Sequence, residues 1–257
     1  GFEEAERIDP AEMPELERYM LHSLKVLDED VRAAYARYDL KRVFARVFQF
    51  CTVDLSAFYF DIRKDALYCD APSSVRRRAA RTVMDETFSR LTAWFAPIAC
   101  FTMEEAWLSR YPSDDGSVHL RVLPQTPDAW RDDALAEKWE TVRRLRRVVT
   151  GALEIERRDK RIGSSLEAAP EVYVTDTAYL DAMQGVDLAE IAITSAARLV
   201  EGEAPSDAFR LEDVAGVAVV PAQAKAKKCV RCWMLLPDVG LNADHPGLCG
   251  RCVEAVS

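Results

Sequence analysis

The chain has 257 residues, of which 49% are hydrophobic and 30% charged, and its formal net charge is −9 at pH 7. This composition indicates one large or several small globular cores, and it excludes disordered and collagen-like chains. No apolar run approaches the roughly 20 residues that a membrane-spanning helix needs, and the acidic start "GFEEAERIDP" is not a signal peptide. We therefore expect a cytoplasmic protein that does not contact membranes.

Apolar residues recur at steps of three and four through residues 1–160, which predicts five helices. The first helix covers Met13–Tyr38, and its inward stripe consists of Leu16, Met20, Leu24, Leu27, Val31, Ala34 and Tyr38. The second helix covers Leu40–Ile62 and is rich in aromatic residues, so we expect burial around much of its circumference. Its apolar positions are Leu40, Val43, Phe44, Val47, Phe48, Leu55, Phe58, Tyr59 and Ile62.

Proline and serine residues separate the later helices. Pro72 and two serines precede the third helix, Ala80–Phe95, and a serine there is expected to cap it. Pro97 is expected in the first turn of the fourth helix, "PIACFTMEEAWLSRY". The fifth and longest helix starts near Asp132, and its inward stripe consists of Leu135, Trp139, Val142, Leu145, Val149, Ala152 and Ile155. Five helices with short connections predict a bundle.

After Ile162 the pattern changes to β-branched runs, which predict strands at 171–175, 190–200 and 216–222 around one short helix, "DTAYLDAM". Just before them, Ser164 and Glu167 fit a capping box. The sequence therefore predicts a mainly α fold in three parts. These are an α-helical bundle over 1–160, a small α/β junction domain over 161–222 and a four-cysteine module over 223–257.

Four of the seven cysteines form two Cys-x-x-Cys pairs, Cys229 with Cys232 and Cys249 with Cys252. Two residues between ligands let both sulfurs of a pair reach one ion, and four thiolates complete a tetrahedral zinc site without an open position. We therefore expect one structural Zn²⁺, with a redox dithiol or a chance pairing of cysteines as the alternatives. His245 could compete as a ligand, although a loop histidine is the simpler interpretation.

The remaining chemistry-bearing residues predict no catalytic centre. The three histidines are not paired at a metal or catalytic spacing, and there is no glycine-rich phosphate loop or nucleophile elbow. Cys51, Cys69 and Cys100 stand among apolar residues and are expected to be core thiols. The residues alone indicate a nucleic-acid-binding or interaction module with structural zinc.

Basic charge is concentrated where nucleic acid could bind. Residues 1–30 hold ten acidic and three basic residues, whereas residues 141–161 hold eight basic and three acidic ones. Local charge sets the field that a phosphate backbone meets. One face of the fifth helix carries Arg143, Arg147, Thr150, Arg158 and Arg161. The alternative is a solvated face that pairs with the acidic N-terminal helix.

Basic and aromatic side chains also flank the first cysteine pair, at Lys228, Arg231 and Trp233. Cations attract phosphates and an exposed aromatic ring stacks on unstacked bases, so this combination suits RNA. The alternative is that Trp233 packs beneath the zinc loop.

Four segments occur here in the order "YFDIRKDALYCD", "APIACFTMEEAWLSRYP", "RRDKRIGSSLEA" and "KCVRCW…GLCGRCVEAV". Together they closely resemble the C-terminal portion of bacterial isoleucyl-tRNA synthetases, from about Glu15 to Val256. The helical bundle is shared with the valyl, leucyl and methionyl enzymes, but the "IGSSLEA" turn and the C-terminal four-cysteine element point to the isoleucyl family. The resemblance implies class I enzymes that attach isoleucine to tRNA with ATP and edit misacylated valine.

The resemblance implies that this chain recognises the anticodon stem-loop of tRNA(Ile), as a monomer continuous with catalytic and editing domains in the same polypeptide. The HIGH and KMSKS motifs are missing, so no catalytic residue is expected and the chain alone should be inactive. The implied zinc ligands are Cys229, Cys232, Cys249 and Cys252. The expected RNA contacts are Arg157, Arg158, Lys160, Arg161, Lys228, Arg231 and Trp233. The competing hypothesis is a free-standing zinc-ribbon protein that binds nucleic acid or another protein.

Overall fold

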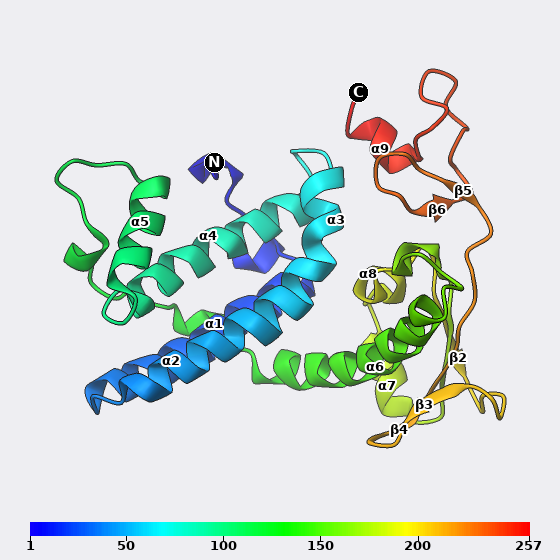
Figure 1. Cartoon of the computed structure of the whole chain (residues 1–257), viewed down its shortest axis with the longest axis horizontal. Helices are drawn as coiled ribbons and strands as arrows, with labels where there is room; N and C mark the ends of the chain where they lie inside the picture. The colour runs from blue at the N-terminus through cyan, green and yellow to red at the C-terminus, as the bar shows by residue number, and fades with distance from the viewer. The chain divides into compact units, whose positions relative to one another are not determined.

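The computed structural model describes residues 1–257, which form two compact units (Figure 1). The first unit comprises Gly1–Leu67 and Pro72–Asp133, and the second comprises Tyr68–Ala71 and Ala134–Ser257. The predicted mainly α fold, with a small mixed sheet and a cysteine cluster, is confirmed. The division into three domains at 160 and 222 stays a prediction.

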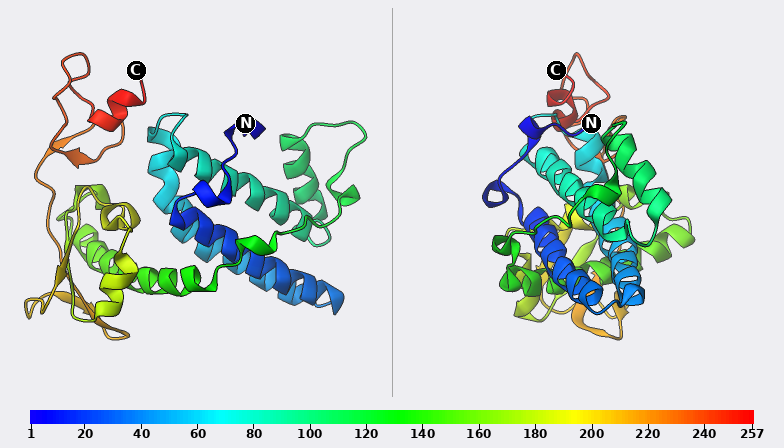
Figure 2. Two further views of the ribbon diagram at one scale, coloured as in Figure 1. Left: turned by 180° about the vertical axis from the view of Figure 1, so that it is seen from behind. Right: turned by 90° about the vertical axis from the view of Figure 1, so that its left-hand side faces the viewer.

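Long helices that lie side by side build the first unit (Figures 1 and 2). They are α1 (Glu15–Ala36), α2 (Leu40–Gln49), the π-helical stretch η3 (Phe50–Phe60), α3 (Asp61–Cys69), α4 (Val75–Phe95) and α5 (Cys100–Arg110). The last two residues of α3 belong to the second unit. Because α2, η3 and α3 follow one another without a break, they form one helix from Leu40 to Cys69. Short 3₁₀ turns complete the unit: η1 (Glu4–Glu6), η2 (Pro10–Glu12), η4 (Val118–Leu120) and η5 (Asp128–Trp130).

Side-chain caps explain where two of these helices begin. The Asp39 carboxylate accepts from the Arg42 amide at 3.0 Å, and Ser74 accepts from the Arg77 amide, which confirms the predicted serine cap of α4. The prediction for Pro97 is wrong, because α5 starts only at Cys100. The amides of residues 98 and 99 both donate to the Phe95 carbonyl, so a turn closes α4 before the next helix begins.

A complete ion pair is buried in the core of the first unit. The Glu17 carboxylate accepts from Arg63 Nε at 2.6 Å, from Arg63 Nη2 at 2.8 Å and from the Tyr59 hydroxyl at 3.0 Å. Both charged side chains are almost completely buried. Buried charges need such partners, since an unpaired one would be costly.

The predicted stripes overestimate burial at the end of α1 and on α2. The α1 stripe is buried from Leu16 to Ala34, but Tyr38 is 91% exposed in the turn after the helix. Val43 and Val47 are buried against α1 and α4, which cover only one side of α2. The prediction of burial around the circumference is therefore wrong for three residues that are about half exposed: Leu40, Phe44 and Phe48.

The helix from Leu40 to Cys69 is long and apolar enough to cross a membrane by length and composition alone. A third of its most apolar stretch is buried within the protein. One such helix is a weak indication of a membrane span, because core helices of globular proteins share these features.

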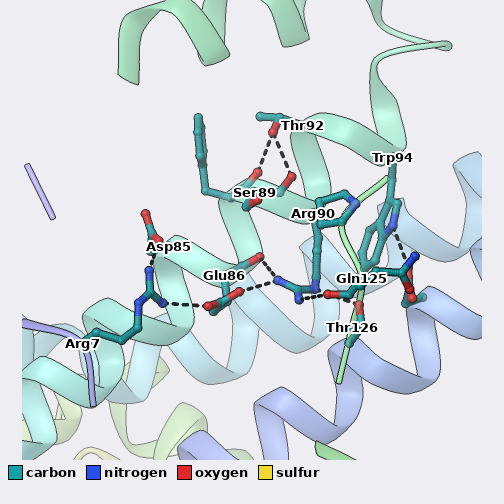
Figure 3. Close-up of polar contacts among 12 residues, drawn as sticks. Arg7, Asp85, Glu86, Ser89, Arg90, Thr92, Trp94, Gln125 and Thr126 are labelled. Carbon is teal, nitrogen blue, oxygen red and sulfur yellow. Dashed lines mark hydrogen bonds and ion pairs between the residues drawn. The ribbon is translucent and has the colours of Figure 1, made fainter. Parts of the chain in front are cut away.

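A polar network ties the N-terminal segment to α4 (Figure 3). Arg7 donates to Asp85 at 2.9 Å and to Glu86 at 2.7 Å. Glu86 also pairs with Arg90, whose Nε donates to the Thr126 hydroxyl at 2.9 Å. Charged groups of this segment are therefore paired inside the first unit.

A four-stranded sheet in the order β2-β1-β4-β3 organises the second unit. β1 (Glu171–Val174) is parallel to β2 (Arg198–Glu201) and antiparallel to β4 (Val214–Val220), which pairs antiparallel with β3 (Phe209–Leu211). The helices α6 (Asp133–Arg158), α7 (Thr177–Met183) and α8 (Leu188–Ala192) lie on one side of this sheet (Figure 2). The strand alternation buries Val172 and Val174 completely.

Two predicted details of this unit are wrong. The segment 190–200 is not one strand, because the Asp187 carboxylate accepts from the Ala189 amide at 2.9 Å and starts α8, leaving only β2 extended. The capping box is also absent before η6 (Ser165–Glu167). The Ser164 side chain caps nothing, and Glu167 accepts from the Gly163 amide at 2.8 Å.

Candidate metal centre and nucleic-acid interface

Two short turns bring the four cysteines together at the end of the second unit. Cys229 and Cys232 lie between the paired strands β5 (Lys227–Lys228) and β6 (Leu235–Leu236). Cys249 immediately precedes α9 (Gly250–Glu254), which contains Cys252. We call these two turns the first and the second cysteine knuckle.

The four sulfur atoms fit one tetrahedral zinc ion. All four lie within 4.8 Å of one another and all four residues are buried. Cys232 Sγ and Cys249 Sγ are 3.8 Å apart, and a zinc ion about 2.3 Å from four thiolates makes a tetrahedron with edges of about 3.8 Å. None of these cysteines is in a disulfide, and His245 is not part of the cluster. The arrangement fits the predicted structural zinc and gives no support to a redox dithiol.

Hydrogen bonds prepare one of the thiols for metal binding. Burial raises the pKa of Cys229, but the amides of Cys232, Arg231 and Cys249 donate to its sulfur and hold its pKa at about 6. Burial raises the pKa of Cys232 and of Cys249 above the ordinary value. Metal binding requires thiolates, so zinc loading is expected to release protons from these two thiols.

The other three cysteines differ in their surroundings. Cys69 is buried and packs in the same cluster as the four zinc ligands. Cys51 is half-buried, and burial raises the pKa of its thiol. The prediction of a core thiol is wrong for Cys100, because the first turn of α5 leaves this residue exposed.

A left-handed residue ends α6 and exposes four basic side chains. The Arg161 amide donates to the Glu156 carbonyl at 2.9 Å and the Lys160 amide donates to the Arg157 carbonyl at 3.0 Å. Lys160 has a φ of +58°, a conformation that favours glycine at the end of a helix. We call the exposed residues Arg157, Arg158, Lys160 and Arg161 the basic turn.

Three exposed arginines of the basic turn pair with acidic neighbours. Arg157 pairs with Glu154 at 2.9 Å, Arg158 with Asp159 at 3.3 Å, and Arg161 with Glu156 at 2.7 Å. Lys160 has no ion pair. Exposed pairs contribute little stability, so Arg157 and Arg158 could exchange a carboxylate for a phosphate at small cost.

The basic turn lies beside the chain segment that leads into the first cysteine knuckle. The Ala224 amide donates to the Glu167 carbonyl at 2.8 Å, and the Gln223 side chain donates to the Arg161 carbonyl. Lys228 Nζ lies 3.6 Å from a Glu167 carboxylate oxygen. Five of the seven predicted RNA contacts are therefore near one another on one part of the second unit.

The last two predicted contacts lie in and after the first knuckle. Trp233 is 62% exposed with a φ of +67°, so it does not pack beneath the zinc loop. The guanidinium of Arg231, by contrast, already has protein partners. It donates to the carbonyls of Tyr68 and Cys69 and contacts Cys252 Sγ at 3.6 Å.

Sequence reasoning missed the ion pair between Arg251 and Asp70, which are 3.2 Å apart. The repeated Cys-x-Arg-Cys spacing of the two knuckles marks Arg251 in the sequence, but nothing in the sequence points to Asp70 as its partner.

The fold and the cysteine cluster define a helical anticodon-binding domain of the tRNA-ligase class followed by a zinc finger. The family "Anticodon-binding domain of tRNA ligase" matches residues 17–173, and the family "Zinc finger found in FPG and IleRS" matches residues 226–255. Over its whole length the chain is 56% identical to an isoleucine--tRNA ligase of Brucella abortus and 51% identical to that of Caulobacter vibrioides. It is also 56% identical, over 99% of its length, to that of Ruegeria pomeroyi. The chain belongs to the family of anticodon-binding domains of tRNA ligases. It spans about a quarter (26%) of the length of these relatives, in their C-terminal region.

Proposed function

We propose that this chain is the part of an isoleucine--tRNA ligase that recognises tRNA(Ile) through the anticodon stem-loop. The complete ligase would use ATP to attach isoleucine to its tRNA. This chain would act in the cytoplasm as part of a monomer, continuous with catalytic and editing domains. Alone it is expected to be inactive, because neither its sequence nor its described side chains supply a catalytic arrangement.

The observation that carries the proposal is the placement of the basic turn beside the zinc module. Lys160, Lys228 and the three arginines of the turn would contact phosphates, while Trp233 would stack on a base of the loop. Two of these side chains, Lys160 and Trp233, project from left-handed backbone positions where glycine is favoured. Residues other than glycine in this conformation cluster at functional sites, which supports a role for these two side chains.

Zinc would serve this function indirectly. Cys229, Cys232, Cys249 and Cys252 would hold the ion and leave no open position on it, so the metal would supply folding energy and no chemistry. The residues of the first knuckle would then present Trp233 in a fixed orientation. Arg231 stays in the predicted contact set, but its guanidinium already has protein partners, so its substitution should weaken RNA binding least.

Two tRNA transcripts that differ only in the anticodon test the proposal. We expect the chain to bind the transcript with an isoleucine anticodon more tightly than the one with a changed anticodon. Trp233→Ala should weaken binding by about 1–3 kcal/mol, the usual value of a base-stacking contact, with zinc content unchanged. Phe101→Ala is the control, because this ring is 91% exposed in the first unit. Equal affinity for both transcripts would contradict the proposal and favour the alternative of a zinc-ribbon interaction module.

A further inference from the structure

Both cysteine knuckles carry an arginine at the same position, and both arginines contact the same short segment. The first knuckle reads Cys-Val-Arg-Cys with Arg231, and the second reads Cys-Gly-Arg-Cys with Arg251. Their common target is Tyr68–Ala71, which the chain contacts assign to the second unit together with the zinc module.

Arg231 contacts this segment through backbone carbonyls. Its Nη2 donates to the Tyr68 carbonyl at 3.1 Å, and its Nη1 donates to the Cys69 carbonyl. These carbonyls belong to the last two residues of α3, where helices leave carbonyl groups without intrahelical partners. The same Nη1 lies 3.6 Å from Cys252 Sγ, so one guanidinium joins the helix end to a zinc-ligand sulfur of the other knuckle.

Arg251 contacts the segment through a carboxylate. Its Nη1 lies 3.2 Å from Asp70 Oδ1, and the Asp70 side chain is only 6% exposed. Its Nη2 reaches Met234 Sδ at 3.8 Å, which places the guanidinium across the apolar packing of the zinc module. A buried carboxylate needs such a partner, so this pair fixes the position of Asp70.

Cys69 completes the contact from the other side. It is 7% exposed and packs in one cluster with the four zinc ligands. Its Sγ lies 4.0 Å from the Arg231 carbonyl oxygen, so the segment and the first knuckle contact each other in both directions. The segment is thus held by two guanidinium groups and by apolar packing.

We propose that Arg231 and Arg251 are positioning residues that clamp Tyr68–Ala71 onto the zinc module, so that zinc occupancy and the order of this segment depend on each other. Zinc fixes both knuckles, and therefore both arginines, at the spacing that the segment requires. Bound zinc would therefore favour the clamped state of the segment over the free state. By linkage, the clamped segment must raise the affinity for zinc by the same factor by which zinc favours clamping. Groups that hydrogen-bond and orient metal ligands change metal affinity by about 10- to 100-fold when removed. The clamp does not depend on tRNA binding, so it stands or fails independently of the proposed function.

The rate of zinc release to a chromogenic chelator tests one direction of the linkage. Asp70→Asn removes the charge that Arg251 contacts without touching a zinc ligand, and we expect zinc to leave about 10-fold faster. Arg251→Gln should have the same effect, the double variant should be no faster than either single one, and Asp70→Glu should restore slow release. Asp207→Asn is the matched control, since Asp207 is exposed in the same unit. Equal release rates for the Asp70 and Asp207 variants would overturn the clamp.

Hydrogen exchange tests the other direction in the unsubstituted chain, which avoids any folding defect of a variant. Removal of zinc should raise the exchange rates of the Tyr68–Ala71 amides at least 10-fold, whereas the sheet amides of Val172 and Val174 should keep their protection. In the cobalt-substituted protein, Arg231→Gln should shift the thiolate-to-cobalt charge-transfer band, because it removes the contact to Cys252 Sγ. Unchanged exchange at Tyr68–Ala71 after zinc removal, or an unchanged band in Arg231→Gln, would contradict the proposal.

Discussion

The helical first unit and the zinc module bury polar groups by different means. The first unit surrounds the Glu17–Arg63 pair with the apolar side chains of several long helices. The zinc module has only a small cluster, in which Val239 and three partly buried residues pack around the cysteines. A region this small cannot bury enough apolar area to fold unaided, so a metal takes the place of a core. A large apolar core can thus surround a buried ion pair, whereas a small region depends on a metal and its thiolate ligands.

Removal of one zinc ligand should have the largest effect, because it should unfold the zinc module and leave the helical first unit folded. Cys249→Ser is expected to abolish zinc binding and unfold the zinc module, because structural zinc contributes roughly 10 kcal/mol or more in peptides of this kind. Zinc content by atomic absorption and amide exchange of both units would measure it. The first unit should keep its helical signal, and Cys100→Ser should change neither quantity. Unchanged zinc content in Cys249→Ser would contradict the four-ligand site.

Disruption of the buried ion pair should instead destabilise the first unit and leave the zinc module intact. Glu17→Gln leaves the Arg63 charge without its partner, which should lower the free energy of unfolding of the first unit by about 3–5 kcal/mol. Chemical denaturation followed by circular dichroism would measure the loss, with zinc content expected to stay constant. Glu12→Gln is the control, since Glu12 is exposed in η2. A loss as small as that of the control would mean that the pair is not a main support of the core.

The end of α6 offers a change that should raise stability while weakening RNA binding. Lys160→Gly relieves a left-handed position at φ +58°, which should stabilise the second unit by about 1 kcal/mol. The same change removes a predicted phosphate contact, so the slope of log affinity for tRNA against log salt should fall by about 1. Lys160→Arg keeps the charge and should retain the slope. A tRNA affinity that is the same at low and high salt would remove the basic turn from the interface.

The smallest expected effect is a pH dependence confined to the first unit. His22 Nδ1 accepts from the Asp132 amide at 2.9 Å, and burial lowers the pKa of His22 despite the nearby carboxylates of Asp133 and Glu29. The unfolded chain therefore binds the proton more readily. The stability that neutral His22 contributes is fully present above about pH 6.5, the ordinary pKa of histidine. It is lost as the pH falls through the lower pKa of His22 in the folded protein. Thermal melting between pH 7.5 and 5 should show this decline, and His22→Gln should reduce it. An identical pH profile in that variant would assign the decline to other groups.

Sequence reasoning succeeded where a pattern is complete in itself. The helical periodicities placed α1, α4 and α6, and the two Cys-x-x-Cys pairs placed the zinc ligands, because both signals depend on local spacing. It failed where the burial of a residue depends on which other elements pack against it. Phe44 and Phe48 look like core residues, but only one side of α2 is covered and both are about half exposed. Their rings stack on each other with centroids 5.6 Å apart.

The function of a charged residue was equally hard to predict from its type. Arg231 and Arg158 look alike in the sequence, yet Arg231 contacts backbone carbonyls at the end of α3 and a zinc-ligand sulfur, while Arg158 is 70% exposed beside Asp159. Only the path of a distant segment, Tyr68–Ala71, distinguishes them. The repeated knuckle arginines were visible in the sequence, but their shared target was not.

The π-helical stretch from Phe50 to Phe60 makes the first unit sensitive to a change in length. Its i→i+5 hydrogen bonding gives it a wider turn than that of the flanking α-helices, and its buried residues are Phe50, Leu55, Phe58 and Tyr59. If the winding of this stretch stayed the same, deletion of a single residue at Thr52 would rotate everything beyond it by up to about 100°. Arg63 would then point away from Glu17, although neither residue had been altered.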